Sequence, residues 1–166
     1  MESRAKLFGH ALHPILIVFP LGLLATTVIF DTIYLFTDNR MMTVVAYWML
    51  VAGVIGGLVA AVFGVVDWLA IPSNTRAKRI GTLHGVGNVI VVLLFIGSWW
   101  LRRGDPALPS TEALALSYVG VGLVMVTGWL GGELVERLGV GVDNGAHLDS
   151  PSSLSHRSAS DTTAKV

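Results

Sequence analysis

The sequence predicts an all-α integral membrane protein: a bundle of four membrane-spanning helices followed by a disordered C-terminal tail. Hydrophobic residues make up 53% of the 166 residues and charged residues only 13%, whereas soluble domains usually carry roughly a quarter charged residues. Four apolar stretches are long enough to cross a hydrocarbon core, which needs about 20 helical residues. Because backbone groups cannot stay unpaired in lipid, such stretches form helices rather than open strands.

The four predicted spans cover about residues 14–36, 43–71, 80–101 and 113–135, so that residues 1–138 form one transmembrane domain. The segments between them carry turn and charge signals, such as Thr37-Asp38-Asn39-Arg40. The first span follows Arg4 and Lys6, as the apolar part of a signal peptide would, but no small-residue cleavage site ends it. We therefore expect this span to be retained.

Residues 139–166 differ in composition from the spans. They are rich in Gly, Ser, Asp and Thr and contain few large apolar side chains. Such a segment cannot bury enough surface to offset its ordering entropy, which predicts a disordered polar tail.

Charge and cysteine content exclude several classes of function. The formal net charge is zero, so no basic field favours binding to nucleic acid. The absence of cysteine rules out disulfides, thiolate metal sites and cysteine-ligated iron–sulfur clusters within this chain.

Lys and Arg residues beside the spans predict the orientation in the membrane. Three lie on one side: Arg40, Arg102 and Arg103. Six lie on the other, in the N-terminal arm, the second loop and the start of the tail: Arg4, Lys6, Arg76, Lys78, Arg79 and Arg137. Because Lys and Arg are enriched in cytoplasmic segments, we predict that both termini are cytoplasmic.

Small residues at helical spacing predict where the helices pack closely. The second span carries such a stripe at Gly53, Gly57, Ala60 and Gly64. Shorter glycine pairs occur in the third span, at Gly81 and Gly85, and in the fourth, at Gly128 and Gly132. These spacings indicate a compact bundle but no particular chemistry.

Polar residues near the ends of the spans are the candidates for a functional site, because such groups are costly in a bilayer unless paired or functional. In an antiparallel bundle, the starts of the first and third spans lie on the same membrane side as the ends of the second and fourth. Six residues therefore fall into one polar layer near the cytoplasmic surface: His10, His13, Asp67, His84, Asn88 and Glu133. Asp31 lies near the other surface, where Arg102, Arg103 or the Trp99 indole could pair with it.

The most specific interpretation of the polar layer is a b-type haem held between His13 and His84, since histidines on two helices can supply both axial ligands. His13 precedes Pro14 at a helix start, where the positive end of the helix dipole favours the neutral imidazole that binds metals. One haem near one surface needs a separate redox protein or a quinone to exchange electrons with. The protein would then be a haem- or quinone-associated redox subunit or a membrane anchor.

Two alternatives use the same residues. A metal such as zinc, iron or manganese could bind instead, with ligands drawn from His10, His13, His84, Asp67 and Glu133. Otherwise the layer only stabilises the bundle of a non-catalytic structural or accessory membrane protein, with the carboxylates paired to Arg76, Lys78, Arg79 or a protonated histidine. No serine nucleophile lies at a recognisable spacing from a base, so activity as an enzyme on its own is not predicted.

Several motifs occur together in an order that marks one family. They are Gly9-His10-Ala11-Leu12-His13-Pro14, Phe19-Pro20-Leu21-Gly22, Phe30-Asp31, Gly64-Val65-Val66-Asp67-Trp68, Arg79-Ile80-Gly81-Thr82-Leu83-His84 and Thr127-Gly128-Trp129-Leu130-Gly131-Gly132-Glu133-Leu134. Over roughly Gly9 to Val142 the chain resembles a bacterial family of membrane proteins, domain of unknown function 2231. The resemblance implies a multi-pass protein of the bacterial cytoplasmic membrane. Relatives of this kind fused to Rieske-type or cytochrome-like domains imply redox chemistry, here with a separate partner protein.

Overall fold

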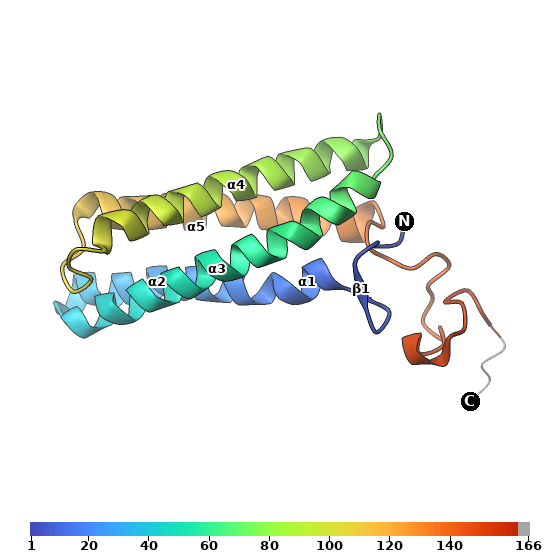
Figure 1. The fold of residues 1–166 in the computed structure, drawn as a ribbon, viewed down its shortest axis with the longest axis horizontal. Helices are drawn as coiled ribbons and strands as arrows, with labels where there is room; N and C mark the ends of the chain where they lie inside the picture. Colours follow the sequence, from blue (N-terminus) through green and yellow to red (C-terminus); the bar gives the residue numbers. More distant parts are fainter. Residues whose placement is uncertain (163–166) are drawn as a thin grey trace.

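Four long helical segments and a short N-terminal hairpin make up the computed structural model, which describes residues 1–162 (Figure 1). The elements in chain order are β1 (Lys6–Leu7), β2 (His10–Ala11), α1 (Leu12–Leu16), α2 (Val18–Thr37), α3 (Arg40–Ala70), α4 (Arg76–Arg102), α5 (Thr111–Gly132), a π-helical turn (Glu133–Arg137) and a 3-10 turn (Ser153–Ser155). The all-α fold class and the four predicted spans are confirmed. Each predicted span coincides closely with one helical segment, the first of them formed by α1 and α2 together.

Side-chain caps explain where three of the helices begin. Asn39 accepts a hydrogen bond from the Met41 N–H before α3, and Thr75 accepts one from the Lys78 N–H before α4. Ser110 caps α5 in the same way. These side chains satisfy backbone donors that have no partner in the first helical turn.

The first span is interrupted between α1 and α2. Pro20 lies in the first turn of α2 and has no backbone N–H, so it cannot continue the hydrogen-bond ladder from α1. The helix is broken at Ile17 as a result. This places His13 on α1, a short helix separate from the long α2.

The β1–β2 hairpin was not predicted. Lys6 pairs with Ala11 and Leu7 with His10. The two residues between the strands, Phe8 and Gly9, have φ of 49° and 84°, the left-handed backbone that a tight two-residue hairpin requires.

The helices alternate in direction along the bundle (Figure 1). The connections α2–α3 and α4–α5 lie at one end, and the N-terminus, the α3–α4 connection and the end of α5 lie at the other. The closest packing is within the pairs α2–α3 and α4–α5. A core of Leu24, Leu50, Val91 and Phe95 joins the two pairs.

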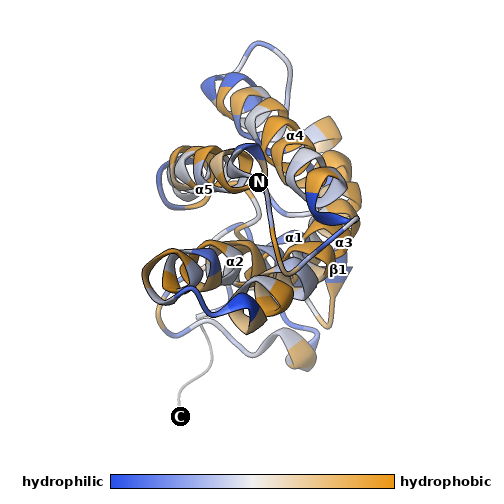
Figure 2. Ribbon diagram, turned by 90° about the vertical axis from the view of Figure 1, so that its left-hand side faces the viewer, coloured by the Kyte–Doolittle hydropathy of each residue, from blue (hydrophilic) through white to orange (hydrophobic). Residues whose placement is uncertain are grey.

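The helices are apolar along most of their length (Figure 2), and many large apolar side chains are exposed on the outer surface of the bundle. Phe19, Leu93 and Met125 are each 60% or more exposed. All four segments are long and apolar enough to cross a membrane: Leu12–Thr37, Arg40–Ala70, Arg76–Arg102 and Thr111–Arg137. The outer surface is therefore the one that lipid contacts.

The predicted glycine stripe of α3 forms its contact with the first span. A Cβ at Gly53 would lie 2.7 Å from Leu24, and one at Gly64 would lie 2.9 Å from His13. Gly57 adjoins Pro20 and Val92. In α4 and α5 the predicted pairs were mostly wrong: a Cβ would meet nothing within 4 Å at Gly85, Gly128 and Gly132.

The start of the polar tail contacts the N-terminal segment. The Met1 amino group donates to the Gly139 carbonyl at 2.7 Å, and the Gly141 N–H donates to the Met1 carbonyl at 2.9 Å. Beyond this point the described part of the tail is irregular apart from Ser153–Ser155. Its disorder in solution stays a prediction.

Candidate functional site

His13 and His84 face each other across the two helix pairs. Their ring centroids are 6.3 Å apart, and their ring planes are nearly perpendicular at 87°. His13 comes from α1, which packs on α3, and His84 comes from α4, which packs on α5. Both side chains are only partly exposed. The pair singled out by the sequence is therefore brought together by tertiary structure.

A backbone carbonyl fixes the His13 ring. Nδ1 lies 2.9 Å from the carbonyl oxygen of Ala60. Because that oxygen can only accept, Nδ1 carries the proton of the neutral ring and Nε2 keeps a lone pair. Gly64, one turn further along α3, leaves the space that the ring occupies. Nε2 of His13 has no hydrogen-bond partner within residues 1–162.

His84 is held in a similar way on the other helix pair. Its Nδ1 lies 2.8 Å from the Thr127 carbonyl oxygen, and a Cβ at Gly131 would lie 3.2 Å from the ring. The same proton assignment leaves a lone pair on Nε2 of His84. Here that nitrogen has a neighbour, the Asn88 amide nitrogen at 3.2 Å.

Asn88 connects His84 to α5. The Thr127 hydroxyl donates to the Asn88 side-chain oxygen at 3.1 Å, which assigns the orientation of the amide. The Asn88 amide nitrogen then donates to the His84 carbonyl at 2.9 Å as well as facing the ring. His13, His84 and Asn88 thus form one connected group.

The other three members of the polar layer have partners elsewhere. Asp67 accepts from the Ser3 hydroxyl at 2.7 Å and from the Arg4 N–H at 2.9 Å. Glu133 pairs with Arg76 at 2.7 Å, one of the cations proposed from the sequence. These carboxylates fasten the N-terminal segment and the α3–α4 connection, and neither joins the histidine pair.

His10 also lies away from the pair. It belongs to β2 and is exposed, and its Nε2 is 3.4 Å from the Ser153 hydroxyl. Within the described part of the chain, no group of three or more His, Asp or Glu side chains could hold a metal ion. The predicted metal ligands His10, Asp67 and Glu133 are thus not gathered around His13 and His84 in this structure.

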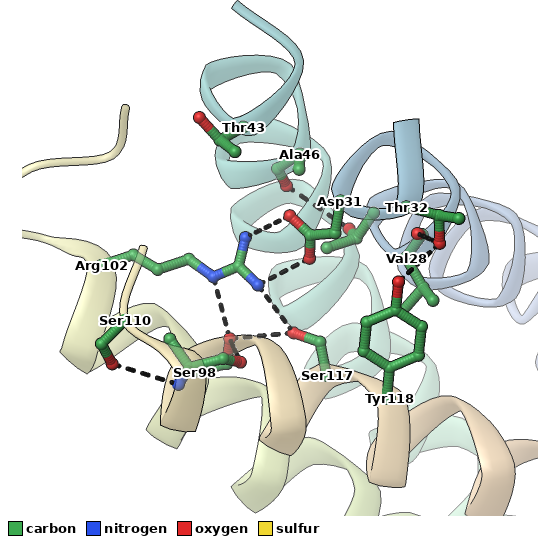
Figure 3. A network of polar contacts seen from close by, with 12 residues as sticks. Val28, Asp31, Thr32, Thr43, Ala46, Ser98, Arg102, Ser110, Ser117 and Tyr118 are labelled. Atoms are coloured by element: carbon green, nitrogen blue, oxygen red, sulfur yellow. Dashed lines mark hydrogen bonds and ion pairs between the residues drawn. The ribbon is translucent and has the colours of Figure 1, made fainter. Parts of the chain in front are cut away.

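A second polar cluster lies towards the other end of the bundle, where α2 and α4 end (Figure 1). Figure 3 shows its contacts. Arg102 binds Asp31 through two hydrogen bonds of 2.8 and 2.6 Å, as one of the three pairings expected from the sequence. The guanidinium also donates to the hydroxyls of Ser98, at 3.0 Å, and Ser117, at 3.1 Å. The serines were missed, since a single serine in an apolar helix carries no signal of its own in the sequence.

The carbonyl acceptors of Ala60 and Thr127 were missed as well. A residue's backbone oxygen is free to accept a second bond anywhere along a helix, so no residue type marks it. The only sequence signal was indirect: Ala60 and Gly64 belong to the small-residue stripe, which lets another side chain reach the α3 backbone.

These features define an integral membrane protein with four helical spans and a histidine pair near one end of the bundle. The chain belongs to the DUF2231 family, described as a predicted membrane protein, whose model matches residues 9–144. The family resemblance found in the sequence is confirmed over nearly the same range. No curated protein and no solved structure matches the chain.

Proposed function

We propose that this protein is a membrane redox subunit in which His13 and His84 hold one b-type haem as its two axial ligands. The observation that carries the proposal is the arrangement of the two rings. Each is anchored through Nδ1 to a backbone carbonyl, each keeps a lone pair on Nε2, and the rings lie 6.3 Å apart.

The spacing supports one metal ion between the rings. The ring centroids of His13 and His84 are 6.3 Å apart, close enough that both imidazoles would hold the same metal ion. Two histidines without a third protein ligand suit haem, because the porphyrin supplies the four remaining ligands. A bare zinc ion would instead need further protein ligands, and Asp67 and Glu133 are engaged elsewhere.

Backbone carbonyls beside the two rings accept hydrogen bonds in the way that is usual for metal-binding histidines. A histidine that ligates a metal usually donates its other N–H to a carbonyl or carboxylate, which fixes the ring and raises its basicity. Ala60 and Thr127 supply these carbonyls. Asn88 faces the lone pair of His84 that a metal would use, so its contact to Nε2 and metal ligation exclude each other. Its bonds to the His84 carbonyl and to Thr127 are compatible with either state.

Bound haem would supply one-electron transfer, and the histidine axial ligands would set its potential. Because the pair lies near one end of the bundle, electrons would be exchanged with a separate redox protein or with a quinone in the bilayer. The excess of Lys and Arg on that side favours the cytoplasmic face of a bacterial cytoplasmic membrane, with both termini cytoplasmic.

A structural role for the polar layer is the second candidate. It is favoured by the hydrogen bonds of Asp67, Glu133 and Asn88, which satisfy these groups within the protein. In this case the histidines would only join α1 to α3 and α4 to α5.

An absorption spectrum separates the two candidates. The protein is expressed with haem precursor supplied, purified in detergent and measured oxidised and after dithionite reduction. The haem proposal expects a Soret band and sharpened visible bands on reduction, both lost in His13→Ala and His84→Ala but kept in His10→Ala. His10→Ala is the matched control because that ring is exposed and lies outside the pair. A colourless folded protein, or bands retained in both pair variants, would overturn the haem proposal.

A further inference from the structure

A shallow groove lies on the outer face of the corner where α3 ends and α4 begins. It has a volume of about 370 Å³ and is lined by Lys78, Arg79, Thr82 and Leu83. Two cationic residues therefore border a mostly apolar groove near the end of the bundle. This combination of charge and apolar surface belongs to neither the histidine pair nor the buried ion pair.

Lys78 is fixed against the end of α3. Its Nζ donates to the Trp68 carbonyl at 2.7 Å and lies 3.8 Å from the centroid of the Trp68 ring. The Trp68 indole in turn donates to the Thr82 hydroxyl at 3.1 Å. These contacts hold the ammonium group and the indole together at the level of the membrane surface, where tryptophan is enriched.

Arg79 carries a positive charge that no carboxylate in the range 1–162 neutralises. Its side chain is exposed, and its guanidinium makes no hydrogen bond or ion pair with any residue in the range 1–162. The neighbouring Arg76 is neutralised by Glu133, and neither Lys78 nor Arg79 has a carboxylate partner in the same range. The start of α4 adds the positive end of its helix dipole.

Below the charges, the surface is apolar. Leu83 is 59% exposed and Val86, one turn further into the span, is 55% exposed. Leu69, at the end of α3, is 66% exposed. A ligand that fits this corner has an anionic head at the level of Arg79 and a hydrocarbon chain directed along α4 towards the centre of the bilayer.

We propose that the groove binds one anionic phospholipid, with its phosphate between Lys78 and Arg79 and an acyl chain over Leu83. Cationic residues beside a span attract anionic lipids, and a guanidinium pairs with a phosphate through two parallel hydrogen bonds. The site is independent of whether a haem binds at His13 and His84.

Lipid titration of the delipidated protein tests the site. The protein is stripped in a neutral detergent and titrated with phosphatidylglycerol or phosphatidylcholine of the same chains, and bound lipid is counted by native mass spectrometry. The expected result is one tightly bound phosphatidylglycerol, held at least tenfold more tightly than phosphatidylcholine. Arg79→Gln should remove this difference, because the glutamine has no charge for the phosphate.

Arg40→Gln is the matched control. Arg40 is also an exposed arginine in the first turn of a helix without a side-chain partner in the described range, but it lies at the opposite end of the bundle. Unchanged preference in Arg79→Gln, or an equal loss in Arg40→Gln, would overturn the proposal. So would displacement of the bound lipid by millimolar inorganic phosphate, since the site would then recognise a free anion. Thermal stability in detergent without lipid checks that both variants fold.

Discussion

Asp31 of α2 and Arg102 of α4 form an ion pair with both side chains completely buried. The carboxylate receives two guanidinium hydrogen bonds, and Ser98 and Ser117 take two further donors (Figure 3). The pair thus joins three of the four spans at the end of the bundle opposite the histidines. A charge pair in such a place stabilises only when its hydrogen bonds are satisfied, as they are here.

Removing one member of this pair should strongly destabilise the protein. Asp31→Ala leaves the Arg102 charge buried without a counter-ion, and loss of one partner of a buried pair costs about 3–5 kcal/mol. We expect a large fall in the midpoint of thermal unfolding in detergent. Asp38→Asn serves as the control, because it removes an exposed charge at the same end and keeps a residue type that tolerates the left-handed φ of 54° at this position.

The double variant Asp31→Leu with Arg102→Met tests whether the stability of the fold requires the two charges or only well-packed side chains at these positions. Replacing both buried charges by apolar groups of similar volume is often close to neutral. The double variant should therefore be more stable than Asp31→Ala. If it is equally unstable, the bonds of Arg102 to Ser98 and Ser117 contribute more than the ion pair does.

Gly120 should tolerate no larger residue. A Cβ there would lie 2.8 Å from the Phe95 ring, which is itself fully buried in the core. Gly120→Ala should destabilise the protein by about 1–3 kcal/mol, because the core must shift to admit the methyl group. Gly122→Ala is the comparison, since a Cβ there meets nothing within 4 Å. Equal unfolding midpoints for the two variants would contradict the α4–α5 packing described above.

The attachment of the N-terminal segment to the tail should depend on pH. Lys6 contacts both Glu2, at 2.9 Å, and Asp143. Hydrogen bonding to Lys6 and to the Asn144 N–H lowers the pKa of Glu2 below its ordinary value of 4.5. Hydrogen bonding to Asp143 and then to Glu2 raises the pKa of Lys6 above 10.5.

The directions of these two pKa shifts define the pH range in which the N-terminal segment stays attached to the tail. A lowered carboxyl pKa stabilises the attached state above about pH 4.5, and this contribution is lost as the pH falls through the lowered pKa. A raised amine pKa stabilises it below about pH 10.5, and this contribution is lost as the pH rises further. Attachment should therefore be strongest between these limits.

Hydrogen exchange at Gly141 measures this attachment, because its N–H donates to the Met1 carbonyl. Near neutral pH, Lys6→Gln should lower the protection factor of this amide severalfold, the size expected for partly exposed pairs. In the parent protein, protection should fall below pH 4.5. Arg4→Gln is the control, because Arg4 contacts Asp67 through its backbone N–H alone. Protection that does not change with pH would contradict this role of Lys6.

The fold could be predicted because the membrane-spanning helices follow from the apolar content summed over each stretch of the chain. Long apolar stretches bounded by polar turns define the spans, whatever the tertiary contacts. Neither the break at Ile17 nor the β1–β2 hairpin follows from this apolar content. Such short elements depend on a few local dihedral angles, which apolar content does not report.

The candidate site was predictable only in part. Antiparallel neighbours place His13 and His84 at one membrane side, and this much follows from counting residues along the spans. Whether Asp67 points to the histidines or to Ser3 depends on rotation of α3 about its axis and on the path of the N-terminal segment. Neither follows from the position of a residue along its span, so the partners of His10 and Asp67 were not predicted, and Arg76 was only one of several cations proposed for Glu133.

Gly64 should control the position of His13. A Cβ there would lie 2.9 Å from Cε1 and 3.0 Å from Nδ1 of the ring, so Gly64→Ala should displace the imidazole and break its bond to the Ala60 carbonyl. If His13 and His84 hold a haem, the variant should lose most of the Soret absorbance per folded protein, while Gly85→Ala, which meets no atom within 4 Å, should keep it. Equal absorbance in both variants would mean that the ring position set by Gly64 does not matter for the cofactor. If neither protein is coloured, a lower unfolding midpoint for Gly64→Ala alone would show that α3 packs against the His13 ring at this position.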